Sequence, residues 1–356
     1  MKKLLIVLLA LTLLLCACGK AETPETTAEP TTEATTEATT EPTTEPPILY
    51  RHPLTGEPLD APFSGFVTTA VINNIKDCLP QFGISKADLY YEVETEGGIT
   101  RCLAVYTNLE GVGSIGPVRS VRTFFNNITA SYGGTVIHCG GSVNGLKGWY
   151  SDTSSLSNWQ HIDQRFNGGY FFRDSERSRQ GYAYEHTLFT TGDSLIKALD
   201  AKDYDKVKEL DFGLTFEDDV ILAGEKADKI VVTFKGDKTT TMTYNKALDE
   251  YEMSQYGGLT VDATTGKTMT FANVLVLYTS QWKIHDGYYS RSYYDLIGEG
   301  EGYMAISGKI VPITWQRDSV EKPFAYFLSD GTPVTLSQGT SYIAIASETS
   351  DPISYE

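Results

Sequence analysis

Arg119 and Arg122 are the two residues of this 356-residue chain whose type and spacing point most directly to a binding function. The apolar residues of 118–132 recur at helical spacing, which predicts a helix with both arginines on one side of its start. Guanidinium groups and the free N–H groups of a helix start both favour anions such as phosphate or carboxylate. Arg101 and Arg173 are further candidate ligand-binding cations. The open alternative is that each arginine pairs with a structural carboxylate.

A row of glutamates supplies such carboxylates. Two alternating runs within 89–106 are joined by Gly97-Gly98, which predicts a β-hairpin with a two-residue turn. In this register Glu94 lies opposite Arg101. Because strand side chains alternate between faces, three glutamates share one face: Glu92, Glu94 and Glu96. These glutamates could act in acid–base chemistry or bind a cation. The alternative is that they form a solvent-exposed strand face with one ion pair.

Histidines and a serine complete the polar candidates. In residues 137–142 a strand runs into two glycines, and a nucleophilic Ser142 with His138 as its base is one arrangement. The two lie too far apart in an extended segment to hydrogen-bond without a sharp turn, and the pattern is not GxSxG. The acid–base hypothesis therefore uses Glu92 or Glu96 with His138 or His186. The five histidines show no paired spacing, so no metal or other cofactor is predicted.

The first eighteen residues carry a different chemistry. Lys2 and Lys3 precede an apolar run over 4–15, which is shorter than the roughly 20 residues of a membrane span. The run ends in Leu-Cys-Ala-Cys, which resembles a bacterial lipobox and predicts cleavage before Cys18 and attachment of a lipid to its sulfur. Residues 1–17 are then a signal peptide, and 18–49 form a lipidated, disordered tether of Thr, Glu and Pro. We expect an exported protein held on the outer face of the bacterial cytoplasmic membrane.

The charge of the chain argues against some partners. The formal net charge is −17, and residues 1–49 hold three lysines against seven glutamates, which leaves −13 for the remainder. A domain this acidic is a poor candidate for nucleic acid, or for an anionic membrane surface without a lipid anchor. Cys78, Cys102 and Cys139 follow the lipobox. Three is an odd number without CxxC spacing, so one disulfide among them stays open.

The elements that must position these residues divide the chain in two. Residues 50–215 mix strands, helices and glycine-rich loops, with a second helix predicted over 192–209. Residues 216–356 form a series of short strands separated by turns, which is typical of an antiparallel β domain. The expected fold class is α+β: a mixed α/β N-terminal domain followed by a mostly antiparallel β C-terminal domain.

Several motifs are distinctive when taken together. The first half holds ADLYYEVETEGGITRCLAVY (87–106), IGPVRSVRTFF (115–125), IHCGGS (137–142), FFRDSERS (171–178) and EHTLFTT (185–191). The second half holds NVLVLYTS (273–280), GEGEGYMAISGKIVPITWQR (298–317) and GTSYIAIA (339–346). In this order they resemble the YerB-like lipoprotein family, whose members carry an N-terminal and a C-terminal DUF3048 domain. The resemblance implies an exported two-domain lipoprotein without an established activity. Its family-like polar residues are Asn73, Glu92, Glu96, Arg101, Arg119, Arg122, His138, Ser142, Arg173 and His186.

Two functional hypotheses follow. The first is a binding module whose N-terminal domain holds an anionic or amide-bearing component of the envelope, such as a cell-wall component or an envelope protein. Its candidate ligand-binding residues are Arg101, Arg119, Arg122, Arg173, Asn73 and Ser142. The second is a metal-independent hydrolase or transferase of the envelope, which needs a glutamate and a histidine to converge in one cleft. The geometry of these side chains separates the two.

Overall fold

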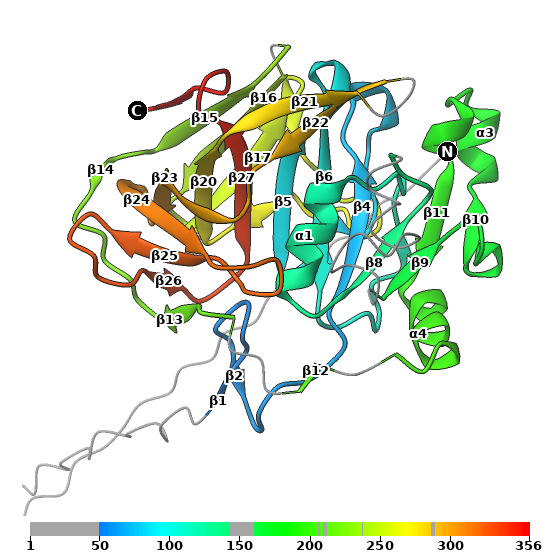
Figure 1. The fold of residues 1–356 in the computed structure, drawn as a ribbon, viewed down its shortest axis with the longest axis horizontal. Coiled ribbons are helices and arrows are strands. Elements are labelled where there is room, and N and C mark those ends of the chain that lie inside the picture. Colours follow the sequence, from blue (N-terminus) through cyan, green and yellow to red (C-terminus); the bar gives the residue numbers. More distant parts are fainter. Residues whose placement is uncertain (1–49, 143–159, 205–206, 209–211, 237, 286–288) are drawn as a thin grey trace, which may run out of the picture. The chain divides into compact units, whose positions relative to one another are not determined.

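The fold is built around one large β-sheet (Figure 1). The computed structural model describes residues 50–142, 160–204, 207–208, 212–236, 238–285 and 289–356, so the predicted signal peptide, Cys18 and the tether lie outside the described residues. The described residues are mostly β, with 47% in strands and 14% in helices. Of the expected α+β fold, the structure shows a mostly β protein with few helices. No helix in the described ranges is long and apolar enough to cross a membrane.

The large sheet contains eleven strands, drawn from both halves of the chain. Its order is β14-β24-β23-β20-β27-β5-β6-β4-β8-β9, and β25 pairs with β24. The first half supplies β4 (Thr68–Asn73), β5 (Leu89–Glu94), β6 (Thr100–Tyr106), β8 (Thr135–His138) and β9 (His161–Asp163). The second half supplies β14 (Glu225–Lys226), β20 (Asn273–Thr279), β23 (Gly298–Ile306), β24 (Lys309–Arg317), β25 (Ala325–Leu328) and β27 (Ser341–Ser347).

The two halves meet inside this sheet. Strands β5 and β27 pair in parallel, from Leu89 beside Ser341 to Val93 beside Ile345. Every residue of both strands is buried. Such runs are expected where a strand is covered on both faces. A hydrogen-bonded ladder between residues about 250 positions apart therefore lies at the centre of the protein.

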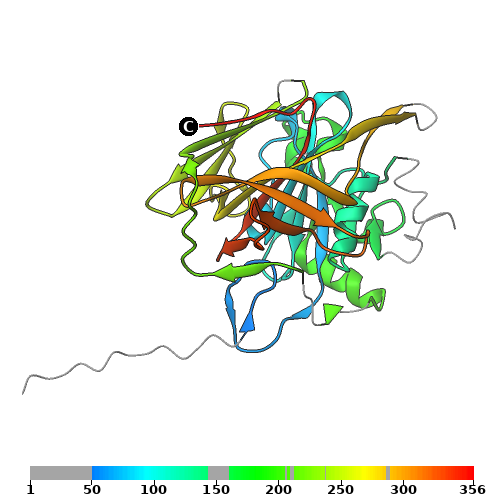
Figure 2. The same cartoon turned by 60° about the vertical axis from the view of Figure 1, so that its left-hand side comes forward.

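Each face of the large sheet has its own hydrophobic core, because successive strand residues point to opposite faces. On one face, Val71 and Leu103 pack with Phe124 and Phe125 of helix α1 (Thr123–Ser131). The other face packs against a six-stranded sheet of β15 (Lys229–Phe234), β16 (Lys238–Asn245), β17 (Glu250–Gln255), β18 (Gly258–Leu259), β19 (Thr270–Phe271) and β28 (Ile353–Tyr355). The turned view shows the helix and this second sheet on opposite sides (Figure 2).

Shorter elements complete the fold. Helix α4 (Gly192–Ala201) begins where the sequence predicts it, with the Thr191 hydroxyl accepting from the Ser194 N–H, but it ends before the predicted residue 209. The others are helix α3 (Ser175–Arg179) and strands β1 (Tyr50–Arg51), β2 (Pro58–Leu59), β3 (Ser64–Gly65), β7 (Ser114–Ile115), β10 (Phe171–Arg173), β11 (Leu188–Thr191), β12 (Val207–Lys208), β13 (Thr215–Glu217), β21 (Gln281–His285), β22 (Ser290–Tyr294) and β26 (Thr335–Ser337).

The prediction of a helix over 118–132 is wrong at its start. Helix α1 begins at Thr123, and Arg122 is its extended N-cap residue. Residues 117–121 instead run extended beside the end of β4, where Arg119 N–H donates to the Val71 carbonyl at 2.8 Å. Backbone pairing with the sheet overrides the helical spacing. Arg119 and Arg122 therefore do not share a helical face.

The predicted hairpin exists, but its register differs by one residue. The turn has three residues, Glu96 to Gly98, and the Thr95 N–H donates to the Ile99 carbonyl at 2.8 Å. Glu94 therefore lies opposite Thr100, and Arg101 lies opposite Val93 on the other face of the hairpin. A shift of one residue moves a side chain to the opposite face, so the predicted Glu94–Arg101 pair does not form.

Candidate functional site

Strands β4, β8 and β9 run parallel, so their carboxyl ends point to one edge of the large sheet (Figure 1). Asn73, His138 and Asp163 are the last residues of these strands. Ligands of parallel sheets commonly bind beyond the carboxyl ends of the strands, where loops leave the sheet. Residues 117–122 cover this edge, and the Val118 N–H bonds to Leu188, at the start of β11.

A cavity of about 110 Å³ lies among these segments. Its polar lining is Arg119, Ser120, Cys139, Arg173, Tyr184 and Glu185. Arg173 ends β10, donates to the Tyr184 carbonyl at 2.6 Å and lies 3.8 Å from the centroid of the Tyr184 ring. Two of the four predicted arginines thus line one cavity. Guanidinium, hydroxyl and thiol groups together suit a small polar or anionic group.

Arg101 lies beneath this loop, with 5% of its surface exposed. Within the described ranges its guanidinium has one hydrogen bond, from Nη1 to the Ser120 carbonyl at 2.6 Å. Its Nε has no partner among the described residues. Burial, followed by the charges of Arg122 and Arg119, holds the pKa of Arg101 well below its usual range. An arginine has five N–H donors, so this buried cation is poorly compensated.

Arg119 is also only partly satisfied. Its Nη1 donates to the Glu185 carbonyl at 3.3 Å, and the Glu185 carboxylate lies 3.7 Å away. Its buried Nε has no partner within the described part of the chain. Arg119 and Arg101 therefore both leave donors unused at the same edge of the sheet, where an anion would compensate them.

Arg122 has a structural partner. Its Nε and Nη2 bind both oxygens of Glu96, at 2.8 and 2.7 Å, and Arg291 lies 3.2 Å from Glu96 Oε2. Burial alone would raise the pKa of Glu96, but the hydrogen bonds and charge of Arg122 hold it at about 2. For Arg122 the alternative of a structural ion pair is confirmed. We call Arg101, Arg119, Arg122, Arg173 and Arg291 the arginine cluster.

His138 belongs to a neutral pair of histidines. Its Nδ1 lies 2.8 Å from the Gly140 carbonyl, and its Nε2 lies 3.3 Å from Nδ1 of His161. Burial lowers the pKa of both rings to about 4. Nδ1 of His138 therefore donates to Gly140. Asp163 Oδ2 lies 4.0 Å from that nitrogen and also binds Arg165.

The other polar candidates lie nearby. Asn73 Nδ2 lies 2.9 Å from Nδ1 of His186, whose pKa is lowered by burial. The Nε2 of that histidine is 3.8 Å from Glu185, a residue of the cavity. Ser142 is buried, and its N–H donates to the Val121 carbonyl at 3.3 Å. Asn73 and His186 therefore lie beside the cavity that contains Arg119 and Arg173, although neither of them lines it.

Glu92 lies elsewhere, in the core between the two sheets. Its Oε1 accepts from Lys238 Nζ at 2.9 Å, and its Oε2 accepts from Thr240 at 2.7 Å and from Tyr342 at 2.8 Å. Asn74 and Thr100 also donate to Oε1. Burial acts against the charge, but Lys238 and the hydroxyls hold the pKa of Glu92 below its usual value. This fully bonded carboxylate joins the two sheets and touches no histidine.

The site also contains residues that the sequence did not single out. Ser120, Cys139 and Glu185 line the cavity, and Arg291 comes from a strand about 170 residues further along the chain. Isolated residues of this kind carry no spacing signal. The three cysteines form no disulfide. The described ranges contain no group of three or more His, Cys, Asp or Glu placed to hold a metal ion.

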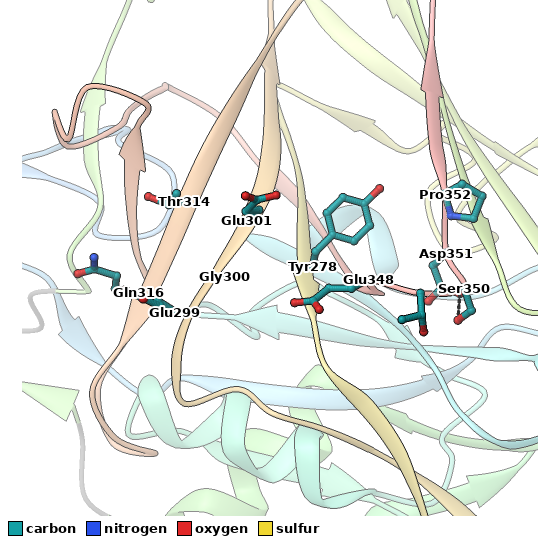
Figure 3. Close-up of a pocket in the computed structure, with 11 residues that line it drawn as sticks. Tyr278, Glu299, Gly300, Glu301, Thr314, Gln316, Glu348, Ser350, Asp351 and Pro352 are labelled. Atoms are coloured by element: carbon teal, nitrogen blue, oxygen red, sulfur yellow. Dashed lines mark hydrogen bonds between the residues drawn. The ribbon is translucent and has the colours of Figure 1, made fainter.

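A larger cavity of about 970 Å³ lies on the face of β20, β23 and β24 (Figure 3). Its lining includes Tyr278 and four carboxylates: Glu299, Glu301, Glu348 and Asp351. Thr314 and Gln316 of β24 complete one side, while residues 348–352 form the other. No lysine or arginine occurs among these described lining residues. Its charge makes this cavity unsuited to an anion.

Comparison with known proteins gives the same family in both halves. Residues 54–205 match the N-terminal domain, and residues 230–343 the C-terminal domain, of the protein of unknown function DUF3048. A relative from Bacillus subtilis (strain 168) named "Putative lipoprotein YerB" is 28% identical over 279 residues, which are 74% of this chain and 80% of the relative. The crystal structure of Bacillus subtilis YerB superposes with a TM-score of 0.73 at 25% identity, covering 85% of this chain and 99% of that one. The chain belongs to the DUF3048 family.

Proposed function

We propose that this protein is an exported lipoprotein, anchored through Cys18 on the outer face of the cytoplasmic membrane, that binds an anionic component of the envelope at its arginine cluster. The lipobox-like ending at Cys18 supports the anchor. The name of the Bacillus subtilis relative supports it independently. The anionic ligand is a carboxylate or phosphate group of a wall component.

One observation carries the binding proposal. Arg101 is a buried cation with a single hydrogen bond, in a part of the chain whose net charge is −13. Four more arginines gather around it, and the carboxylates that meet them among the described residues are Glu96 and the exposed Glu185. Proteins rarely bury a poorly compensated charge, because the desolvation penalty is several kcal/mol. An anionic ligand beside Arg101 and Arg119 supplies the missing partner.

The acid–base alternative has less support. Glu92 is fully bonded inside the core, and Glu96 is held by two arginines with a pKa of about 2. Neither carboxylate contacts His138 or His186. A general acid and a general base need to lie within reach of one substrate. The geometry therefore favours binding over catalysis by these groups.

Retention on purified cell-wall material tests the binding proposal. The full-length protein, solubilised in detergent, is sedimented with the wall material at several salt concentrations. Replacing Arg119 and Arg173 by Gln should lower retention about tenfold or more, because two charge-assisted contacts are lost. The matched control is Arg179→Gln, an exposed arginine paired with Glu176 on α3. Unchanged retention of the double variant would overturn the proposal.

Cysteine substitution tests the anchor. Cells that express Cys18→Ala should incorporate no labelled palmitate into the protein and should release it from the membrane fraction. Cys16→Ala is the matched control, because it changes the neighbouring cysteine and leaves the residue beside the predicted cut intact. Labelling of the Cys18 variant at the wild-type level would exclude this anchor.

A further inference from the structure

The β21–β22 hairpin is a separate two-stranded sheet that lies over the tip of the β5–β6 hairpin (Figure 1). One of its faces packs against that tip. Gln281 donates to Glu94 at 3.1 Å, and the Ser292 hydroxyl donates to the Thr95 carbonyl at 3.0 Å. These contacts show which face of the hairpin is turned towards the tip. Alternate residues of a strand point to opposite sides, so the neighbours of Gln281 and Ser292 lie on the other face.

The opposite face carries aromatic rings. Trp282 and Tyr293 are cross-strand partners, and their rings stack with centroids 6.1 Å apart and planes 27° apart. Trp282 is 44% exposed, and Tyr289, just before β22, is 62% exposed. Exposed clusters of large aromatic side chains commonly mark interaction sites. We call Trp282, Tyr289 and the half-buried Tyr293, whose hydroxyl accepts from Thr123 at 3.2 Å, the aromatic platform.

The aromatic platform adjoins the arginine cluster. Arg291 lies on the same face as Trp282 and Tyr293, 4.6 Å from the centroid of the Tyr289 ring. Its guanidinium reaches Glu96, which also binds Arg122. A chain of contacts therefore runs from the Tyr289 ring through Arg291 and Glu96 to Arg122.

We propose that the aromatic platform binds the sugar rings of a glycan that carries the anionic group held by the arginine cluster. The inference rests on the proposed function and names its ligand class. Trp and Tyr offer flat apolar faces with a polar group at the edge. This pattern matches a pyranose, which has an apolar C–H face and hydroxyls around its rim. The charge of Arg291, whose side chain is 18% exposed, complements acidic groups along the glycan.

The test uses a neutral probe and a charged one. Chitotetraose, which has sugar rings and no anionic group, is titrated into the full-length protein in detergent by isothermal titration calorimetry, a readout that does not depend on Trp282. Sedimentation with purified peptidoglycan is measured in parallel. Trp282→Ala with Tyr293→Ala should weaken both about tenfold or more, because each stacked ring contributes to affinity. Trp282→Phe with Tyr293→Phe keeps both rings and should retain peptidoglycan binding within about threefold.

The control replaces two exposed apolar residues outside the hairpin, Ile221→Ala with Leu248→Ala, and should leave both measurements unchanged. Circular dichroism confirms that each variant is folded. If the ring-deleted variant binds both probes as the wild type does, the inference is overturned. It is also overturned if loss of the rings abolishes binding to phosphatidylglycerol vesicles while leaving the glycan binding intact.

The two proposals fail separately. Chitotetraose has no charge, so Arg119→Gln with Arg173→Gln should leave its binding unchanged. If the arginine variant no longer binds peptidoglycan and the wild type does not bind chitotetraose, the anion-binding proposal is supported. The glycan-binding role of the aromatic platform is then overturned. If the wild type binds chitotetraose and the arginine variant binds peptidoglycan as the wild type does, the anion-binding proposal is overturned and the aromatic platform is supported.

Discussion

Replacing Arg101 by Met separates a binding residue from a structural one. The guanidinium of Arg101 is buried and makes one hydrogen bond, to the Ser120 carbonyl. Its pKa is lowered by burial, followed by the charges of Arg122 and Arg119, so its surroundings disfavour the charged form. Methionine keeps an unbranched side chain and removes the charge. We expect the variant to be more stable than the wild type and to bind the anionic ligand more weakly.

Two opposing contributions set the size of the effect. Loss of the charged hydrogen bond to Ser120 costs about 1.5–3 kcal/mol. Removing the buried cation relieves a desolvation penalty of several kcal/mol and the repulsion from Arg122 and Arg119, but it also loses the attraction to Glu96. Replacing buried ionic groups by apolar residues of similar volume is often neutral or stabilising by about 1–4 kcal/mol. We expect the free energy of unfolding of the Arg101→Met protein to rise by about 1–2 kcal/mol.

Urea denaturation followed by circular dichroism measures this change. Arg177→Met is the matched control, because Arg177 is equally buried at 3% exposure but is well bonded. It donates to the carbonyls of Cys78, Pro80 and His186. Its loss should destabilise the protein by about 3 kcal/mol or more. If Arg101→Met also destabilises by more than about 1 kcal/mol, Arg101 is a structural residue and the reasoning fails.

Three further predictions concern the folded state. Glu92→Gln leaves the Lys238 ammonium buried without its counterion and should lower the free energy of unfolding by about 3–5 kcal/mol. Urea denaturation measures this loss, with the exposed Glu301→Gln as the control. If Glu92→Gln destabilises no more than the control does, the Glu92–Lys238 pair does not stabilise the core. His138 and His161 have pKa values of about 4 in the folded protein, whereas unfolded imidazoles bind protons below about 6.5. The folded state therefore binds fewer protons than the unfolded state between these values, and stability should fall as the pH drops from 6.5 towards 4; denaturation midpoints that stay constant over this window would refute the assignment. Gly302→Ala places a Cβ 2.4 Å from the Val276 carbonyl and should destabilise by more than about 2 kcal/mol, whereas Gly169→Ala, which meets open space, should have little effect on the melting temperature.

Local patterns in the sequence predicted local structure. The alternation within 89–106 gave the hairpin, and the start signals at Gly192 gave helix α4. The register was wrong because Gly97-Gly98 suits a two-residue turn as well as the three-residue turn that forms. Both glycines have positive φ in the turn that forms, and a type I′ two-residue turn needs the same. The choice between the turns depends on burial of the hairpin faces, which the local sequence does not contain.

The site depended on contacts between distant residues. Arg291 joins Glu96 across 195 positions, and no motif spacing reports such a pair. The helical spacing around Val118 was real, but pairing of 117–121 with the end of β4 replaced the first turn of the helix. Of the six polar residues that line the cavity, the sequence singled out Arg119 and Arg173. It did not show which of them are bonded and which, like Arg101, are left with unused donors.

The pairing of β5 with β27 constrains the order in which the protein can fold during its synthesis. A chain is synthesised from its N-terminus, so β5 exists long before residues 341–347 that pair with it. Until then one side of β5 is an open, apolar strand edge, which invites pairing with other chains. The regions matched by the two DUF3048 domains thus share one sheet. This sheet becomes complete only when β27, its last strand in chain order, has formed. Protease resistance of the first region should appear only when residue 347 has been added.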